Sequence, residues 1–327
     1  MNTKAMINNL FKHPLFLSGF IFIFLLLAAS FVHTVFFQGK IPVTEFLRNN
    51  EGNITSFAPF NPLEVPPLGT DEVGRHIIVL LIQGAKYTIG ISILVAGLRV
   101  IISTIIGLFF ENYFSKFNQY LSGLVNGFYY IPAALICYIL LYDVIFTPHG
   151  EVDGYSIFQK MIFQFFVLTI VAIPTMSLLI GNQLNQIYKS EFITSAKTLG
   201  GSRLHILHKH VLPFMVPLLL IQFIQEIIKV LILLIHLGFF HLLFGGTMEQ
   251  QLDDTQNAYI SVSSEWSGMV GNGFNHLGGW SWMFLSVVIA FTLVILALNL
   301  VTKGIEDVFL EDRYTTGKNI KKHKRKN

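Results

Sequence analysis

Hydrophobic residues gather along this chain in long apolar runs that polar segments separate. The runs lie at about 15–37, 87–110, 120–145, 161–183, 214–244 and 281–302. A helix that crosses the roughly 30 Å hydrocarbon core of a bilayer needs about 20 apolar residues. Because each run reaches that length, the pattern predicts an all-α polytopic membrane protein with about six transmembrane helices.

Composition supports this fold class and adds two details. Hydrophobic residues make up 53% of the chain, charged residues only 13%, and the mean hydropathy is +0.60. The first run continues beyond Ser30 and is longer than the apolar stretch of a signal peptide, so we expect an uncleaved anchor. The only cysteine, Cys137, lies inside an apolar run and is expected to be a buried packing residue. A net charge of +3 gives no indication of a nucleic-acid partner.

The distribution of Lys and Arg predicts the orientation of the chain in the membrane. If the N-terminus is cytoplasmic, the cytoplasmic segments hold 15 of the 22 basic residues and the external segments hold 5, with Arg99 and Lys229 inside the runs. Basic residues are retained on the cytoplasmic side. Both termini are therefore expected to be cytoplasmic.

Charge and proline density divide the chain into segments. The connection at 38–86 holds five prolines, which favours an extended, irregular path. The segment 246–280 holds no Lys or Arg, as expected of an external loop. The predicted segments are an N-terminal end with the first transmembrane helix at 1–37, an external connection at 38–86, a transmembrane core at 87–310 with a cytoplasmic loop at 184–213, and a basic cytoplasmic tail at 311–327.

The polar stretch KSEFITSAKTLGGSRLHILHKHVLP, residues 189–213, predicts two short helices with a break between them. Gly200 stands at the break, where a left-handed backbone favours glycine, and Ser202 suits the cap of the second helix, 203–211. Pro213 suits the first turn of the next membrane helix. On pattern alone, the stretch is either a docking element for a cytoplasmic partner or a solvated connector.

The same stretch resembles the cytoplasmic signature loop of ABC importer permeases, whose pattern is E-A-A, three residues, G, nine residues, I-x-L-P. Four residues fall on the pattern, namely Ala196, Gly200, Leu212 and Pro213. Three residues depart from it: Thr194 and Ser195 replace the glutamate and the first alanine, and His210 stands at the aliphatic position.

A second stretch resembles the G-T-D-x-x-G-R-D segment that precedes the second membrane helix in the peptide and nickel permease subfamily, on its "C" type subunit. The matching residues are Gly69, Thr70, Asp71, Gly74 and Arg75, and His76 replaces the last aspartate. Near the C-terminus, residues 266–269 resemble a W-G-x-M/L motif. Asn299, Leu300, Gly304 and Asp307 resemble the subfamily's N-L-x-G-D-G-L-R-D ending, from which Thr302, Lys303 and Glu306 depart.

The resemblance implies a non-catalytic subunit with an ABC importer permease-like core in the bacterial cell membrane. The loop would form a coupling helix that docks on a cytoplasmic ATPase, and because the chain has no G-x-x-x-x-G-K-S/T loop, ATP hydrolysis needs separate subunits. The implied partners are a second permease subunit in a heterodimer, two cytoplasmic ABC ATPases, an extracytoplasmic solute-binding protein and the lipid bilayer. No cofactor and no nucleic acid are expected. The implied solutes are peptides, nickel or metal chelates.

Polar residues inside the fifth run mark a second candidate site. Lys229 lies roughly 23 Å along the helix from Phe214, a depth at which ionisable groups are costly. Gln222, Lys229 and His236 are expected to share one face, with Gln225 and Glu226 beside it, and Glu226 and Lys229 are spaced to pair. Two interpretations stay open: this face lines the translocation path, or it contacts the partner permease.

Other polar residues have plainer interpretations. Arg99, in the second run, is expected to make a polar contact between helices. On an α-helix His205 and His208 share a face while His210 points elsewhere, so we predict no metal site there. A stand-alone secondary transporter and an intramembrane enzyme are the alternatives to the permease. The chain shows no inverted repeat, which many such transporters have, and no H-E-x-x-H, G-x-S-x-G or S-x-x-K motif.

Overall fold

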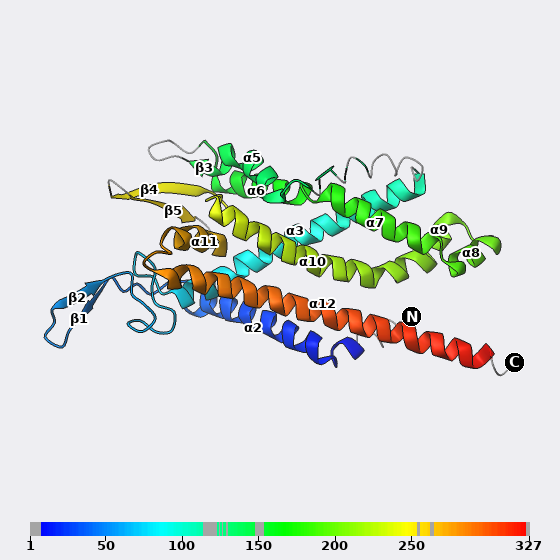
Figure 1. The fold of residues 1–327 in the computed structure, drawn as a ribbon, viewed down its shortest axis with the longest axis horizontal. Coiled ribbons are helices and arrows are strands. Elements are labelled where there is room, and N and C mark those ends of the chain that lie inside the picture. Colours follow the sequence, from blue (N-terminus) through cyan, green and yellow to red (C-terminus); the bar gives the residue numbers. More distant parts are fainter. Residues whose placement is uncertain are drawn as a thin grey trace.

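A computed structural model describes residues 8–113, 123, 125, 127, 128, 130–147, 154–253, 256–261 and 265–324. These residues form an elongated bundle of helices (Figure 1). Its longer helices are α2 (Pro14–Phe36), α3 (Ile77–Tyr113), α5 (Ala133–Ile145), α6 (Ile157–Ile170), α7 (Ile173–Tyr188), α10 (Leu212–Phe239) and α12 (Ser281–Lys324).

Five helical segments among the described residues are long and apolar enough to cross a membrane. They are 14–36, 77–110, 157–188, 203–239 and 281–309, and α5 is a shorter apolar helix. The predicted all-α, multi-pass fold is thereby confirmed, although part of the predicted run 120–145 lies outside the described residues. Helix α3 begins at Ile77, ten residues before the predicted run.

One end of the bundle carries the short helices α8 (Glu191–Thr198) and α9 (Arg203–Ile206) and a π-helical turn, η1 (Leu207–Val211). The start of α2 and the last turns of α12 lie at this same end (Figure 1). The predicted cytoplasmic loop and the two terminal helices therefore share one side of the bundle. Helix α12 continues through most of the predicted basic tail.

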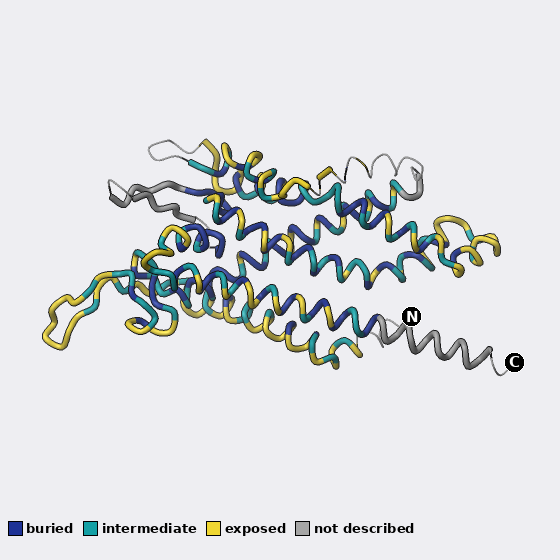
Figure 2. Tube along the Cα trace, viewed as in Figure 1, coloured by how far each residue is buried: buried dark blue, intermediate teal, exposed yellow. Residues whose placement is uncertain are grey.

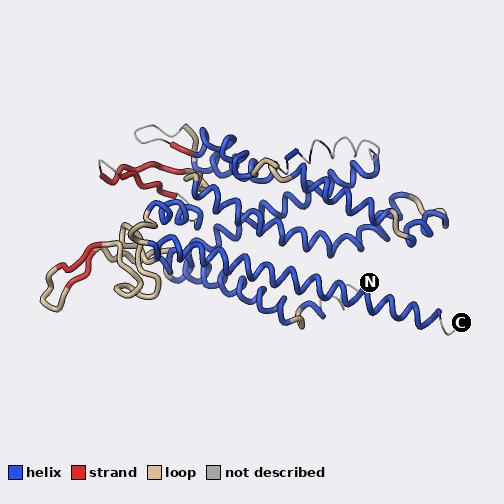
Figure 3. Tube along the Cα trace, in the orientation of Figure 1, coloured by secondary structure: helices blue, strands red, loops and turns tan. Residues whose placement is uncertain are grey.

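The opposite end holds the β-strands and a short helix (Figure 3). β1 (Phe46–Arg48) pairs antiparallel with β2 (Ile54–Phe57). A second sheet has the order β3-β4-β5, with β3 (Phe146–Thr147) parallel to β4 (Thr247–Asp253) and β4 antiparallel to β5 (Gln256–Ser261). Helix α11 (Trp266–Asn275) follows β5. Both segments predicted to be loops thus contain a hairpin.

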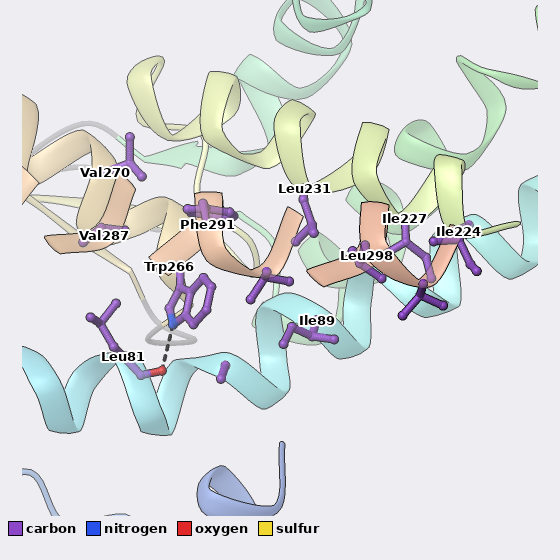
Figure 4. Packing of buried hydrophobic residues seen from close by; sticks show 14 of the residues in the cluster. Leu81, Ile89, Ile224, Ile227, Leu231, Trp266, Val270, Val287, Phe291 and Leu298 are labelled. Carbon is purple, nitrogen blue, oxygen red and sulfur yellow. Dashed lines mark hydrogen bonds between the residues drawn. The ribbon is translucent and has the colours of Figure 1, made fainter. Parts of the chain in front are cut away.

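The largest hydrophobic cluster among the described residues contains Trp266, which lies at the start of α11 and is 1% exposed. Its indole nitrogen donates a hydrogen bond to the Leu81 carbonyl oxygen at 2.9 Å, and its ring packs edge-on against Phe291 (Figure 4). The Trp266 backbone N–H donates to Thr88 Oγ1 at 3.0 Å. One residue of the W-G-x-M/L resemblance therefore joins α11 to α3 and α12.

Helix α2 packs along α12 through small residues. A Cβ added at Gly19 would overlap the Ala297 carbonyl oxygen, and one added at Gly304 would overlap Phe16. Small residues let membrane helices approach closely and gain van der Waals contact. Gly304, part of the resembling C-terminal motif, thus has a packing role.

Burial follows a membrane pattern (Figure 2). Large apolar side chains stay exposed on the outside of the helices, among them Phe24 and Leu25 on α2 and Ile139 on α5. Such surfaces are compatible with lipid, because lipid tails are as apolar as these side chains and their exposure there carries no free-energy cost. Cys137 is fully buried in a hydrophobic cluster, which confirms its predicted packing role.

Candidate functional site

The loop between α7 and α10 is a compact helical hairpin. Gly200 has φ +82°, and its N–H donates to the Lys197 carbonyl at 3.0 Å. The Gly201 N–H donates to the Ala196 carbonyl at 3.1 Å. These two bonds make a Schellman motif, the standard way to end a helix on glycine. The predicted left-handed conformation at Gly200 is therefore present, and a local hydrogen-bond pattern fixes the turn.

The second half of the hairpin runs into α10 without a break. Ser202 caps it as predicted, because its Oγ accepts a hydrogen bond from the His205 N–H at 3.3 Å. Beyond Ile206 the backbone is π-helical to Val211 rather than α-helical, and α10 begins directly at Leu212. Pro213 lies at the start of α10 as predicted, but the preceding π-helical turn makes it part of one continuous helical segment, 203–239.

One face of the hairpin is packed against the membrane helices. Ile193 on α8, Ile206 on α9 and Val211 in the π-helical turn are buried. They share a hydrophobic cluster with residues of α7 and with Met215 of α10. The hairpin is therefore in direct contact with α7 and α10.

The outward face carries exposed apolar residues. Leu199 is 89% exposed and Leu204 is 72% exposed. Thr194 and Ser195, at the departures from the signature pattern, are also exposed, and each hydroxyl donates to a carbonyl oxygen one turn back along the chain. The apolar surface of Leu199 and Leu204 is thus open to contact from outside the chain.

The prediction that His210 points away from His205 is wrong. The two ring centroids lie 6.1 Å apart in an edge-on arrangement. The prediction assumes α-helical periodicity, whereas a π-helix places residues five apart on one face. No group of three or more His, Cys, Asp or Glu side chains suited to a metal ion lies in the described part of the chain.

A buried ion cluster lies among the membrane helices. Arg99 on α3 and Glu226 on α10 are almost fully buried, and Arg99 Nη1 lies 2.9 Å from Glu226 Oε2. Lys229 Nζ lies 2.8 Å from the other carboxylate oxygen, Oε1. The predicted pairing of Glu226 with Lys229 is confirmed, and Glu226 is shared between two cations.

Arg99 also reaches a third helix. Its Nε and Nη2 donate to the Leu168 carbonyl oxygen at 3.0 and 2.5 Å. The guanidinium therefore links α3 to α6 and to α10, which confirms the predicted polar contact between helices. This bond satisfies a carbonyl in the part of α6 that leads into the short break before α7.

The polar residues of α10 do not all share one exposed face. Lys229 has a side chain that is 58% exposed, and His236 is also exposed. Gln225 is half-buried, whereas Gln222 is buried and its Oε1 accepts no hydrogen bond within the described residues. Gln222 lies on the same stripe of α10 as Lys229 and His236, as predicted, but it is buried where they are exposed. Helix α3 crosses α10 obliquely and packs against it (Figure 1).

The two glycines of the motif before α3 serve close packing. Gly69 has φ +75° and Gly74 has φ +79°. A Cβ at Gly69 would overlap the Phe60 carbonyl oxygen, and a Cβ at Gly74 would overlap the Thr44 carbonyl oxygen. Both positions therefore require glycine for two independent reasons, backbone conformation and space.

The polar residues of the same motif hold its turn together. Asp71 accepts hydrogen bonds from the Arg75 N–H at 2.8 Å and from Arg75 Nε at 2.7 Å. Thr70 Oγ1 accepts from the Phe60 N–H at 2.9 Å, and the Thr70 carbonyl accepts from Trp282 Nε1 at 3.3 Å. The motif docks the 60–76 segment onto the start of α12.

Glu72, inside this motif, reaches the turn after α11. Its Oε1 lies 2.8 Å from His276 Nε2. Burial raises the pKa of the Glu72 carboxyl above its ordinary value, an effect that the attraction of His276 opposes and the nearby Asp71 carboxylate strengthens. This pair ties the motif to the connection between α11 and α12.

The C-terminal motif residues also have structural contacts. Asn299 Nδ2 donates to the Ile295 carbonyl oxygen within α12 at 3.0 Å. Asp307 lies 3.1 Å from Lys303 Nζ and 3.8 Å from His13 Nε2. Asp307 thus helps to position the start of α2 against α12.

Two features of these sites are not predicted from the sequence. A polar contact of Arg99 is expected, but its partner Glu226 is not identified. The sequence signal for this pair is one basic and one acidic residue, each near the middle of an apolar run. The exposed pair of Leu199 and Leu204 is also missed. Its signal is an apolar residue on each side of a glycine break in a polar loop.

Comparison with known proteins gives one family and several relatives. Residues 103–311 match the family described as binding-protein-dependent transport system inner membrane component. A probable D,D-dipeptide transport system permease protein of Escherichia coli is 25% identical, over 73% of this chain and 71% of its own length. A putative peptide transport system permease protein of Brucella suis is 24% identical, over 80% of each chain. A dipeptide transport system permease protein of Alkalihalophilus pseudofirmus is 21% identical, over 86% of this chain and 83% of its own length.

Proposed function

This chain belongs to the family of binding-protein-dependent transport system inner membrane components, and we propose that it forms half of the translocation path of an ATP-driven peptide importer. The resemblance to ABC importer permeases of the peptide transporter type is confirmed by the family match and by the named relatives. The chain is thus a multi-pass membrane transport subunit rather than an intramembrane enzyme or a secondary transporter.

The observation that carries the coupling role is the construction of the hairpin. Its inner face is packed with α7 and α10, and its second helix continues into α10. The Schellman turn at Gly200 fixes the angle between its two helices. We therefore propose that residues 184–213 act as a lever that transmits the closure of a separate cytoplasmic ATPase to the membrane helices.

The proposed contact with the ATPase is the exposed surface of Leu199 and Leu204. Apolar side chains that stay this exposed on a compact hairpin with polar and basic neighbours favour a protein interface. The neighbouring residues Lys197, Arg203 and Lys209 add positive charge, which would guide association with an acidic groove.

The remaining partners follow from the family. We propose a second permease subunit, two ABC ATPases and an extracytoplasmic solute-binding protein. The relatives are named as peptide or dipeptide transport permeases, which favours a peptide over nickel or a metal chelate as the solute. The Glu226 and Lys229 cluster is proposed to border the path, with Gln222 buried behind it.

The proposed orientation places the hairpin and both termini in the cytoplasm. The charge distribution along the sequence supports this orientation, as does the position of the hairpin beside the ends of α2 and α12 (Figure 1). Residues 38–76, with the motif from Gly69 to Arg75, then lie outside the cell, at the end where a solute-binding protein would dock.

The coupling role can be tested by placing charge on the hairpin surface. In a Leu199→Asp, Leu204→Asp double variant, we expect the ATPase to copurify several-fold less with the permease while the variant inserts normally. Leu63→Asp is the matched control, since Leu63 is 93% exposed at the opposite end of the bundle. If the ATPase copurifies equally with the wild type, the double variant and Leu63→Asp, the hairpin is not the coupling surface.

A further inference from the structure

We propose that Lys229 binds a carboxylate group of the transported solute, an inference that rests on the proposed function as a peptide permease. Lys229 is the exposed member of the ion cluster on α10, whereas its partners Arg99 and Glu226 are buried. The proposal adds a chemical class of ligand and a named residue to the translocation path.

The charge of the cluster favours an anion beside Lys229. Arg99 and Lys229 each carry a positive charge, and the single carboxylate of Glu226 is divided between them, one oxygen to each. The cluster of three therefore has a net charge of +1. In a membrane interior an uncompensated charge is costly, so a negative group next to Lys229 is stabilised.

The Lys229 ammonium group also has hydrogen-bond donors that its contact with Glu226 does not use. A lysine ammonium group has three N–H donors. One is used by Glu226 Oε1, and within the described residues Lys229 makes no other hydrogen bond. With 58% of the side chain exposed, the remaining donors are open to a group from outside the chain.

The surface around Lys229 carries two polar residues beside the apolar Ile232, which is 40% exposed. Gln225, one turn away on the same stripe, is half-buried, and His236, about two turns further along, is exposed. Neither side chain has a hydrogen-bond partner in the part of the chain that the structure describes. Exposure of Lys229, Gln225 and His236 to lipid would be costly at this depth, so these side chains face water or a polar partner.

A carboxylate satisfies these requirements better than a neutral or cationic group. It supplies the missing negative charge and accepts charge-assisted hydrogen bonds from the ammonium group. Every peptide with a free C-terminus carries one. Glu226 and Arg99 then have a defined role, because they hold Lys229 in place while leaving the cluster one positive charge in excess.

The test uses the complete transporter with its binding protein in proteoliposomes, in a Cys137→Ala background. The substrates are alanyl-alanine and its C-terminal amide. We expect Lys229→Met to lower uptake of alanyl-alanine about tenfold, as the loss of one hydrogen bond to a charged group predicts, and to leave uptake of the amide unchanged. Lys229→Arg should keep both rates within about twofold, because it keeps the positive charge.

Restoring the charge at position 229 chemically gives a second readout. It tests whether Lys229 binds the carboxylate even if the wild type does not transport the amide. In Lys229→Cys, modification with an aminoethyl thiosulfonate reagent restores a positive charge and should restore uptake of alanyl-alanine. Modification with a neutral methyl reagent should not. Rescue by both reagents or by neither would overturn the proposal.

Two other results would also overturn it. Equal losses with both substrates would mean that Lys229 has a structural role. Loss of the second permease subunit from purified Lys229→Met complexes, with unchanged uptake per intact complex, would show that Lys229 pairs with an acidic residue of that subunit instead of a solute. If wild-type complexes carry neither substrate while their ATPase is active, the proposed peptide transport itself fails, which is distinct from a selective failure at Lys229.

Discussion

The Arg99 guanidinium and the Glu226 carboxylate lie 2.9 Å apart in the interior of the bundle, although 127 residues separate them in the chain. The pair joins α3 to α10, and the bond from Arg99 to the Leu168 carbonyl adds α6. Three membrane helices are therefore connected by a single polar centre.

Removing Arg99 should destabilise the protein more than removing the pair. Arg99→Met leaves Glu226 with Lys229 alone and leaves the Leu168 carbonyl without these donors, so we expect a loss of about 3 kcal/mol in the free energy of unfolding. The Arg99→Met, Glu226→Gln double variant should recover about 1 kcal/mol or more, because no buried carboxylate remains. Unfolding in mixed micelles measures both. Strictly additive losses would show that the two side chains are not coupled.

Replacement of Gly200 should uncouple ATP hydrolysis from transport. Its φ of +82° strains a β-branched residue by more than about 1 kcal/mol, although no atom lies within 4 Å of a Cβ there. We expect Gly200→Val to insert normally and to lose most solute-dependent stimulation of the ATPase. Gly200→Asn is the matched control, since asparagine adopts the left-handed conformation more readily, and it should retain most activity. Normal coupling in the valine variant would show that the turn is not part of the lever.

Labelling of single cysteines should show the orientation. In a Cys137→Ala background, a membrane-impermeant thiol reagent added outside intact cells should modify Leu63→Cys, which lies before α3. It should modify Leu204→Cys on the hairpin only after the cells are opened. Both positions are highly exposed, so access and not burial decides the result. Labelling of Leu204→Cys in intact cells would reverse the proposed topology.

The Glu72 carboxyl should give a defined pH dependence. Because burial raises its pKa in the folded protein, its contribution to stability is present below the ordinary value of 4.5 and is lost as pH rises through the raised value. The stability of the wild type relative to Glu72→Gln should therefore fall as the pH rises from 4.5 through the raised pKa of Glu72. Thermal unfolding of the two proteins across that interval measures the difference. A difference that rises with pH would mean that the ion pair with His276 outweighs burial.

The sequence is sufficient for features that depend on neighbouring residues. The left-handed turn at Gly200 and the cap at Ser202 are both local, and both are predictable from the loop alone. The apolar runs are also predictable, because a bilayer sets their length. The pairing of Glu226 with Lys229 follows from their spacing on one helix.

Features that depend on how helices cross cannot be predicted in this way. The burial of Gln222 and the exposure of Lys229 on one stripe depend on how the neighbouring helices pack against α10. The partner of Arg99 lies on a helix distant in sequence. The π-helical turn that brings His205 to His210 has no residue pattern of its own in the loop.

The motif from Gly69 to Arg75 is a further case of this kind. Its residues can be matched to a family pattern, but its role as a docking turn emerges only from its contacts with Phe60 and Trp282. Trp282 lies more than 200 residues further along the chain, with Thr70 and Trp282 separated by 212 positions. No local pattern indicates such a contact.

Uptake of a labelled dipeptide into proteoliposomes tests most directly whether this chain is a permease subunit of an ATP-driven peptide importer. The proteoliposomes contain both permeases, the ATPases and the binding protein. We predict accumulation that requires ATP hydrolysis and that is abolished when this chain is omitted from the complex. Accumulation at the same rate without this chain, or accumulation by this chain alone without ATP, would contradict the proposed function.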